Sequence, residues 1–572
     1  MGCKCCRWPV NACRMARMVK LLPLSFTGLV LFLTVHSFYN DAVITGTLLL
    51  ILFFPVFGFL PRKPLNLPPG PSGIPVLGYL PFLGEKPHQE MAKLAKKYGP
   101  LVHIQLGSFP GLVVANARLA KEVLMTQDQV FSSRPDSFVT WAKHFAYYHE
   151  GSEVRYSMGT AKPGPFLRNM RRLVAVELVA PKRIEHFKAI RREEMDAMVQ
   201  ELLSEVKSGK QIVDLNMAIG ALAMNVMSRM VIQKRYYAKD ISPETKKEAY
   251  EFQRLLVTVL TWAGYPFLQD FVPGLRPLMS MISSNEREMA KMAKNTDAFF
   301  ETILQEHRQR QNTVESSQDF VDVLIQSVGD DGKRLDDKAI KAVTMEMFMA
   351  GAETTATTIE WALAELLHHP DIQTNLQTEL DTVIGTTRMA QESDIPNLPY
   401  LHAVIRESFR LHPVSPLMIP HSNSEATELD GYHIPANSHI FINSWAIGRD
   451  SSIWSSPEHF DPERFHKSNK FLDSQSSEDQ RSMVGIDYKG LSYELLPFGS
   501  GRRGCPGMQI ASHVVSVAVA RLVHGFRWSL ADDRAPEDMD MEERFGMNLQ
   551  MRSPLHRVCC EKRLPEEVYL SM

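Results

Sequence analysis

The chain has 572 residues, of which 44% are hydrophobic and 22% charged. This composition is that of an ordinary globular protein and excludes a mainly disordered or collagen-like chain. The formal net charge is −2 at pH 7, so no basic field points to nucleic acid, and we expect no such partner. The odd count of 7 cysteines does not fit a secreted disulfide framework and indicates a reduced body that faces the cytosol.

An apolar head precedes the body. Residues 1–20 form a basic N-terminal segment, and 21–39 and 42–60 are two runs of 19 residues without Lys, Arg, Asp or Glu. Each run approaches the ~20 apolar residues that cross a bilayer. We therefore predict a membrane anchor over 21–60, made of one or two hydrophobic segments. The sequence leaves open the number and orientation of the spans, the start methionine and the lipidation of the early cysteines, Cys3, Cys5 and Cys6.

After a Pro-rich stalk at 61–78, residues 79–572 are predicted to form a mainly α-helical body with small β-sheets. Helical periodicity runs through 86–98, 166–206, 244–260, 283–310 and 338–369, and strand-like runs lie at 101–106, 111–114, 432–434 and 438–442. The helix at 338–369 is the clearest, because Asp336 or Asp337 can cap its start and Pro370 ends it. Residues 466–486 are expected to form a surface loop.

The run 497–507 carries the strongest chemical signal. Its pattern is F-x-x-G-x-R-x-C-x-G, formed by Phe498, Gly501, Arg503, Cys505 and Gly507. A glycine-rich turn lets the backbone approach a flat ligand, and a cation two residues before the thiol favours the thiolate. A thiolate presented in this way is a strong donor to haem iron. A structural cysteine beside a turn is the alternative, but five fixed positions in ten residues favour the ligand.

This run resembles the haem-ligand signature of the cytochrome P-450 superfamily. The resemblance covers about 65–570 and implies the fold of that superfamily behind an N-terminal membrane anchor, with haem b (iron protoporphyrin IX) as cofactor and Cys505 as the axial ligand of its iron. It also implies an enzyme that inserts one oxygen atom of O2 into a C–H bond of a small apolar substrate. The electrons are expected from NADPH through NADPH–cytochrome P-450 reductase at the endoplasmic reticulum membrane, with the catalytic domain facing the cytosol.

A second signal lies inside the long helix, at 350–355. Gly351 is a poor helix former, which suggests close approach of a ligand to the backbone. Thr hydroxyls can bond backward to a carbonyl and bend the helix. The sequence resembles the acid–alcohol motif of the superfamily, with Glu353 as the acid and Thr354 as the alcohol that deliver protons. A helix whose small residues pack against a neighbour is the alternative.

A third signal is the E-x-x-R pair Glu407 and Arg410, whose spacing places both side chains on one helical face. An exposed pair of this kind contributes little to stability. The family resemblance instead implies a buried network with Arg464 of the later P-E-R-F, which supports the region behind the haem and has no catalytic role.

A fourth signal concerns the haem propionates. Arg171 matches the arginine of the family's W-x-x-x-R, but Leu167 stands where the family has tryptophan. The resemblance implies that Arg171, His421 and Arg503 contact propionates. Solvated surface positions are the alternative for Arg171 and His421. The loss of the tryptophan N–H requires another donor, or indicates an inactive relative.

The finer resemblance is to the plant microsomal branch. F-S-S-R-P at 131–135 and F-G-M at 545–547 are similar to plant in-chain fatty-acid hydroxylases of the sporopollenin pathway, which favours a medium-chain fatty acid as substrate. The acid–alcohol motif and the tail at Arg563 are equally similar to phenylpropanoid or flavonoid ring hydroxylases, the alternative. A haem-thiolate isomerase that needs no O2 and a haem-binding sensor without enzymatic activity are further alternatives.

Overall fold

The computed structural model of the chain divides into two units, Met1–Leu67 and Pro68–Met572. It describes residues 65–572 apart from 137–138, 148–155, 239, 265, 312–317, 330–331, 467–485, 533 and 547. The predicted anchor at 21–60 and basic segment at 1–20 lie outside the described residues, as does nearly all of the loop expected at 466–486. The description that follows therefore concerns the second unit.

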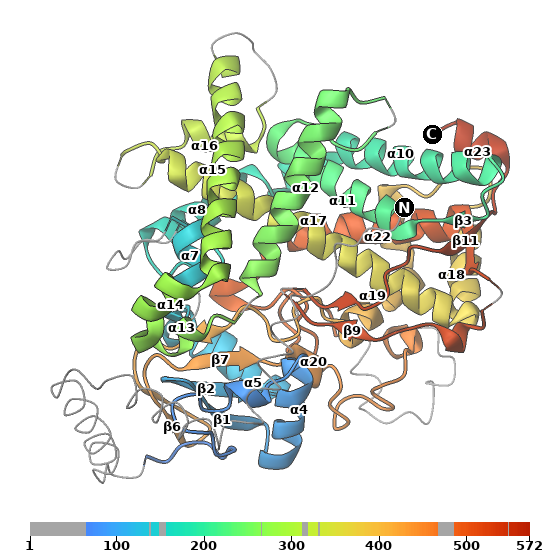
Figure 1. Cartoon of the computed structure of the whole chain (residues 1–572). Helices are drawn as coiled ribbons and strands as arrows, with labels where there is room; N and C mark the ends of the chain where they lie inside the picture. The colour runs from blue at the N-terminus through green and yellow to red at the C-terminus, as the bar shows by residue number, and fades with distance from the viewer. Residues whose placement is uncertain are drawn as a thin grey trace, which may run out of the picture. The chain divides into compact units, whose positions relative to one another are not determined.

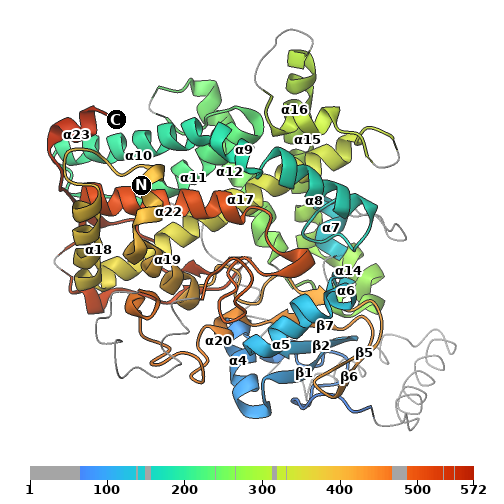
Figure 2. The same ribbon diagram turned by 180° about the vertical axis from the view of Figure 1, so that it is seen from behind.

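The second unit is mostly helical, as Figures 1 and 2 show from opposite sides. The longer helices are α4 (Pro87–Tyr98), α8 (Pro165–Glu177), α10 (Lys188–Lys207), α11 (Leu215–Ile232), α12 (Pro243–Ala263), α15 (Ser284–Gln311), α17 (Asp337–His368), α18 (Pro370–Val383), α19 (Pro399–Leu411) and α22 (Met508–Gly525). The shorter helices are α5 (Ala117–Lys121), α6 (Asp128–Phe131), α7 (Val139–Phe145), α9 (Pro181–His186), α13 (Leu268–Phe271), α14 (Arg276–Ile282), α16 (Phe320–Gln326), α20 (Ser444–Ile447) and α23 (Glu566–Leu570).

The strands form four small sheets. A four-stranded sheet has the order β1 (Leu101–Leu106), β2 (Phe109–Val114), β7 (His439–Ile442), β4 (His421–Ser422), and a three-stranded sheet has the order β3 (Ile212–Val213), β11 (Val558–Lys562), β8 (Phe526–Leu530). Two-stranded sheets are formed by β5 (Thr427–Leu429) with β6 (Tyr432–Ile434), and by β9 (Glu543–Arg544) with β10 (Gln550–Met551). The predicted fold class, mainly α with small sheets, is confirmed.

Helix α17 is the centre of the body, with α11, α15, α19 and α22 packed against it (Figure 1). The Asp336 carboxylate accepts from the amide of Ala339 at 2.8 Å and so caps the start of α17. The last third of the helix is fully buried, with Trp361, Ala362 and Ala364 at 0% exposure, whereas several residues of the middle segment 350–356 are partly exposed. A helix that is apolar on all sides belongs in a core, and this one fixes the positions of the motif that it carries.

The helix expected at 166–206 is wrong as a single element, because the chain forms α8, α9 and α10 there. Ala180 adopts an extended conformation (φ −61°, ψ 148°) and Pro181 starts α9. The ring of a proline disfavours helical backbone at the residue before it, which explains this break. The apolar periodicity continues across the break, so the pattern alone did not reveal it.

Within the described residues, one helix, α11, is long and apolar enough to cross a membrane, but 61% of it is buried. It packs on α10 and α17 and is therefore a core helix of the body.

The end of the predicted stalk is attached to the four-stranded sheet. The amide of His103 in β1 donates to the carbonyl of Pro69 at 3.0 Å, and Gly78 pairs with Leu106. A Cβ atom on Gly70 would lie 1.8 Å from the carbonyl oxygen of His103, so only glycine fits this approach. Residues 69–78 thus belong to the body.

Candidate functional site

The Cys505 loop connects a 3-10 turn, Gly501–Arg503, to the start of α22. The Cys505 amide donates to the carbonyl of Phe498 at 2.8 Å and thereby closes the loop. Gly501 has a φ of +64°, and a Cβ atom there would lie 2.0 Å from the carbonyl oxygen of Leu124. The glycine in the motif is therefore required both by the backbone conformation and by close packing.

The Cys505 side chain lines a hollow that is open to solvent. It is accessible to solvent, yet burial raises the pKa of its thiol because protein atoms surround it. The backbone N–H of Gly507, the charge of Arg171 and the backbone N–H of Met508 act in the opposite direction and lower the pKa. Burial is the largest of these influences, so the pKa of the free thiol is raised on balance. Coordination by a metal ion deprotonates a thiol, so iron itself would have to supply the remaining stabilisation of the thiolate.

Two arginines lie beside this loop. Arg171 of α8 donates to the carbonyl of Gly504 at 2.8 Å, which ties that helix to the loop. Arg503 donates to the carbonyls of Ser132, Met158 and Ala161 at 2.7, 3.2 and 2.6 Å.

Two further basic side chains complete the cluster. Arg134 is buried and donates to the carbonyls of Gly159, Ile419 and Pro420, at distances of 2.6 to 2.9 Å. His421 is also buried, and its Nδ1 contacts the carbonyl of Phe131 at 3.0 Å. The sequence analysis quoted Arg134 within the F-S-S-R-P motif but assigned it no role.

The four basic side chains repel one another. Burial and then the neighbouring Arg171 lower the pKa of Arg503 to about 10. Burial, Arg503 and Arg171 lower the pKa of Arg134, and burial and Arg134 lower that of His421. Nearly neutral carbonyls are the main partners of this cluster, although buried cations normally require anions. A ligand with carboxylate groups, such as the propionates of haem, therefore fits the site.

One carboxylate, Glu346 of α17, lies near this cluster. It accepts hydrogen bonds from the backbone of Met158 and Gly159 at 2.7 and 2.6 Å and from the Ser157 hydroxyl at 3.1 Å. Burial raises its pKa, while the bonds from Gly159, Met158 and Ser157 lower it. Sequence reasoning did not find Glu346, since nothing in the helix pattern shows that a distant segment packs on it.

The acid–alcohol motif lies on α17. The Thr354 hydroxyl donates to the carbonyl of Ala350 one turn earlier. The Glu353 carboxylate accepts from the side-chain amide of Gln550 in β10. Thr354 is thus bonded within its own helix, whereas Glu353 is bonded to a separate strand. Beside Gly351 lies Met227 of α11, whose Cε would be 2.5 Å from an added Cβ atom. Helix packing therefore explains this glycine, contrary to the ligand approach that we expected.

The E-x-x-R residues form a buried ionic network. Glu407 accepts two hydrogen bonds from Arg410, both 2.7 Å long, and one from Arg464 at 3.0 Å. The side chains of Glu407 and Arg410 are 0% exposed and that of Arg464 is 4% exposed. Arg410 also donates to the carbonyls of Gly448, Pro457 and His459, which fixes the following segments around α19.

Leu167, where the family pattern has tryptophan, is 7% exposed and belongs to the large apolar core. It thus packs as a core residue of α8. Arg134 lies within electrostatic reach of both Arg171 and Arg503.

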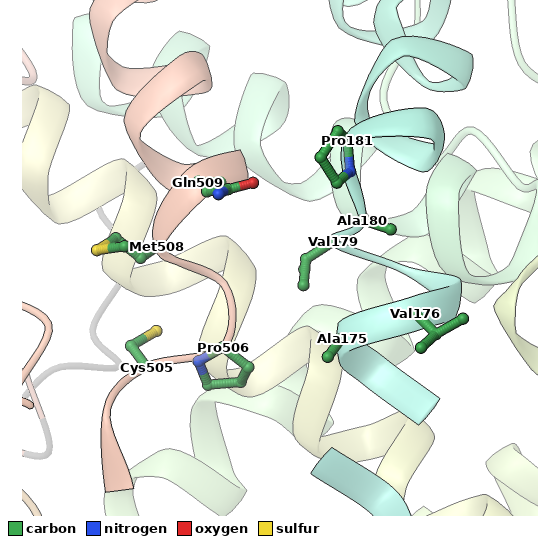
Figure 3. A pocket seen from close by; sticks show the side chains of 9 residues that line it. All are labelled: Ala175, Val176, Val179, Ala180, Pro181, Cys505, Pro506, Met508 and Gln509. Carbon is green, nitrogen blue, oxygen red and sulfur yellow. The ribbon is translucent and has the colours of Figure 1, made fainter. Parts of the chain in front are cut away.

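A hollow of about 390 Å³ adjoins the Cys505 loop (Figure 3). It lies between the end of α8 and the start of α22 and is lined by Ala175, Val176, Val179, Ala180, Pro181, Cys505, Pro506, Met508 and Gln509. No residue of α17 lines it, so it adjoins Cys505 on the side of α8. Arg168 and Arg172 of α8 and Arg502 of the loop are exposed, and the bond from Arg171 to Gly504 joins this helix to this loop. Arg502 also pairs with Asp128 at 3.0 Å.

Comparisons with known proteins agree with this geometry. The family model described as cytochrome P-450 matches residues 68–559. A cytochrome P-450 from Panax ginseng is 38% identical over 84% of this chain and 91% of its own length. A flavonoid 3′-monooxygenase from Arabidopsis thaliana is 38% identical over 88% of this chain and 93% of its own length. A zebra fish cytochrome P-450 solved with abiraterone superimposes with a TM-score of 0.65 and 27% identity, over 84% of this chain and all of that structure.

The family match extends over nearly the whole second unit, in which α17, the helix of the acid–alcohol motif, packs against α19 and α22. The family binds haem through a thiolate, and the basic cluster beside Cys505 suits the propionates of that cofactor. The chain belongs to the cytochrome P-450 family and is a haem-dependent monooxygenase of its plant branch.

Proposed function

We propose that the chain hydroxylates an aromatic ring of a flavonoid-like substrate. The observation that carries this proposal is its similarity, over most of both chains, to a protein named as a flavonoid 3′-monooxygenase. The finer sequence pattern favoured a medium-chain fatty acid instead, but the comparisons support the flavonoid alternative better, since proteins from several plants with flavonoid hydroxylase names match at 36 to 38% identity.

In this proposal Cys505 is the axial ligand, and the loop formed by Phe498 and Gly501 presents its sulfur. When bound, haem supplies the iron centre that activates O2 and transfers one oxygen atom to a C–H bond. Arg171 and Arg503 would neutralise the propionates, and His421 would contact them as an uncharged hydrogen-bonding group; we add Arg134 to the two arginines. The mutual repulsion of these side chains supports the assignment, because two carboxylates in their midst would relieve it.

Glu353 and Thr354 are the proposed proton donors. Burial raises the pKa of Glu353, and this is the direction that favours the protonated form from which a general acid donates. The Thr354 hydroxyl is bonded to the helix backbone and is thus held in one orientation. The network of Glu407, Arg410 and Arg464 takes no part in proton transfer and supports the Cys505 side of the site.

The substrate is expected beside an apolar wall formed by Leu417, Met418 and Ile419. This segment adjoins the basic cluster, because Arg134 donates to the carbonyl of Ile419. Leu417 packs in the apolar cluster that covers the four-stranded sheet, and Phe545 of the segment after β9 packs against the same cluster. Stacking of an aromatic substrate on an aromatic side chain gives a geometric preference that a flexible fatty acid lacks.

The electrons are proposed to come from NADPH through the membrane-bound NADPH–cytochrome P-450 reductase, with the chain anchored at 21–60 in the endoplasmic reticulum. Arg168, Arg172 and Arg502, all exposed, form a basic patch that suits an acidic partner. Charge reversal of the three should slow reduction of the haem and abolish its salt dependence. Arg557→Glu, at another exposed position, is the control. Unchanged reduction in the triple variant would refute the patch.

The decisive experiment is the spectrum of the reduced protein with carbon monoxide, compared between wild type and Cys505→Ala. The matched control is Cys559→Ala, which removes a half-buried thiol of β11. A strongly red-shifted Soret band that only Cys505→Ala abolishes supports the ligand. Turnover with reductase, NADPH and either a flavonoid or a medium-chain fatty acid then tests the substrate. Hydroxylation of the fatty acid alone would refute the flavonoid proposal.

A further inference from the structure

The β9–β10 hairpin is attached to α17 at several points close to the acid–alcohol motif. Trp361 of α17 donates to the carbonyl of Leu549 at 2.8 Å, and Glu360 accepts from the amide of Leu555 at 2.9 Å. Gln550, on β10 between these points, donates from its side chain to Glu353. The segment 549–555 therefore lies along the buried face of the helix that carries the proposed proton donor.

Arg544 fixes the direction of the Gln550 amide. The two residues are opposite each other in the β9–β10 pair, and Arg544 donates to Oε1 of Gln550. Because a guanidinium only donates, it must face the oxygen of the amide and leave the N–H for Glu353. The resulting chain runs from Arg544 through Gln550 to the carboxylate, and each link has the required donor and acceptor.

The other end of the hairpin is fixed to a different part of the body. Glu543 of β9 accepts from Gln89 and Trp445 at 2.9 and 2.7 Å and contacts His88 at 2.8 Å. Phe545, between the two strands, stacks on His88 with ring centroids 5.4 Å apart. Phe545 also packs against the apolar cluster of Leu417, beside which the substrate is expected. A substrate that displaces Phe545 would therefore disturb the hairpin that carries Gln550.

We propose that Gln550, oriented by Arg544, is a positioning residue for the Glu353 carboxyl, so that the β9–β10 hairpin couples the substrate pocket to the supply of protons. This inference rests on the proposed role of Glu353 in the monooxygenase reaction. Gln550 transfers no proton in it, since a side-chain amide is neither acid nor base at neutral pH. It holds one carboxylate oxygen of Glu353, and thereby the direction of the whole group.

The electrostatics of the surroundings agree with this assignment. Burial is the largest influence on Glu353 and raises its pKa, and Glu360 on the same helix acts in the same direction. The hydrogen bond from Gln550 and the charge of Arg544 lower the pKa. Among the described groups that face Glu353, Gln550 and Arg544 are therefore the two that stabilise its ionised form.

The test compares Gln550→Met with Met551→Leu in the full-length, haem-loaded protein. Methionine keeps the length of the side chain and removes the N–H donor. Met551 is the next residue of β10, so its buried side chain points to the opposite face of the pair, and leucine has a similar volume. Both variants should retain the red-shifted carbon monoxide spectrum, which shows that haem and fold are intact.

The first readout is the infrared band of the protonated Glu353 carboxyl in the substrate-free protein, assigned by its absence in Glu353→Gln and followed against pH. Loss of a hydrogen bond to a carboxylate is expected to lower the ratio of ionised to protonated carboxyl about tenfold at a given pH, so the titration midpoint of Gln550→Met moves upward. Gln550→Glu, which adds a second carboxyl group, should move it further. Met551→Leu should leave it in place.

The second readout is the yield of product per NADPH consumed, with hydrogen peroxide measured alongside. In Gln550→Met we expect a severalfold fall in that yield and a matching rise in peroxide, with a changed pH profile. An unmoved carboxyl titration would overturn the proposal, as would a moved titration with an unchanged yield and pH profile. Failure of the proposed function is separate, because it appears as loss of the Cys505 spectrum in wild type, whereas the infrared titration needs no turnover.

Discussion

Asp270 makes the stability of the body sensitive to pH in a way that one substitution should remove. It lies on α13 and is 1% exposed. Its carboxylate accepts from the amide of Thr140 at 3.1 and 3.2 Å and from the Thr140 hydroxyl at 2.6 Å. It therefore caps the first turn of α7 from a segment 130 residues away along the chain, and it connects two segments that adjoin the expected substrate region.

Burial raises the pKa of Asp270 from 3.8 to about 7, although the bonds from Thr140 and the charge of Arg276 oppose the change. A carboxyl whose pKa is higher in the folded protein binds its proton more tightly there, so folding is favoured at low pH. That contribution is complete below the unfolded pKa and is lost as the pH rises toward 7. Between pH 5 and pH 8 the loss is about 2.5 kcal/mol.

Asp270→Asn keeps an oxygen that accepts from Thr140 and removes the titration. For a body of about 500 residues, an unfolding entropy of about 1 kcal/mol/K converts 2.5 kcal/mol to about 2.5 °C. The difference in Tm between variant and wild type should therefore grow by roughly this amount from pH 5 to pH 8. Asp532→Asn, a change at an exposed carboxylate that pairs with Arg557, is the control. The measurement is thermal unfolding of the haem-loaded proteins, followed by circular dichroism.

A difference in Tm that stays constant with pH would refute the reasoning, because it would show that Asp270 titrates alike in the folded and unfolded chain. Hydrogen exchange in 139–145 gives a local check. Opening of this segment would expose Asp270 to water, so the free energy of opening should fall as the pH rises, as it does for unfolding. Wild type should therefore protect the Thr140 amide less at pH 8 than at pH 5 after correction for intrinsic rates, and Asp270→Asn should show no such change.

Three further predictions concern the site. Glu407→Gln leaves Arg410 and Arg464 buried without their carboxylate and should cost about 3 to 5 kcal/mol, measured by denaturant unfolding; a loss below 1 kcal/mol would contradict the network. Gly501→Ala should lower haem content severely, because the added Cβ atom would meet the backbone of Leu124. Gly351→Ala should be tolerated, because the added Cβ atom would meet only the flexible end of the Met227 side chain. Equal loss of haem in the two variants would be evidence against this packing argument. Haem with esterified propionates should raise the Tm of the haem-free protein less than haem does; an equal rise would exclude pairing with the basic cluster.

The local parts of the site were predictable from the sequence. Cys505, its glycines and Arg503 lie within one short turn, so their spacing alone specifies their neighbours. The start of α17 was also predictable, since the Asp336 cap lies directly before the helix. Gln550 and Glu346 were not predictable in the same way, because each acts through a partner that only tertiary packing brings close. The same holds for the break at Pro181, where apolar periodicity continues across a change of helix.

The basic cluster shows why the site residues come from separate segments. Arg134, Arg171, His421 and Arg503 lie before α7, on α8, on β4 and before α22. Each donates to a backbone carbonyl of another segment. These bonds hold the segments together while they bring like charges close, at a cost in free energy that the lowered pKa of Arg503 reflects. A dianionic ligand removes that cost where the segments meet. Binding of haem and stable packing of the surrounding segments are therefore linked, since the charges that recognise the cofactor also oppose the folding of the protein without it.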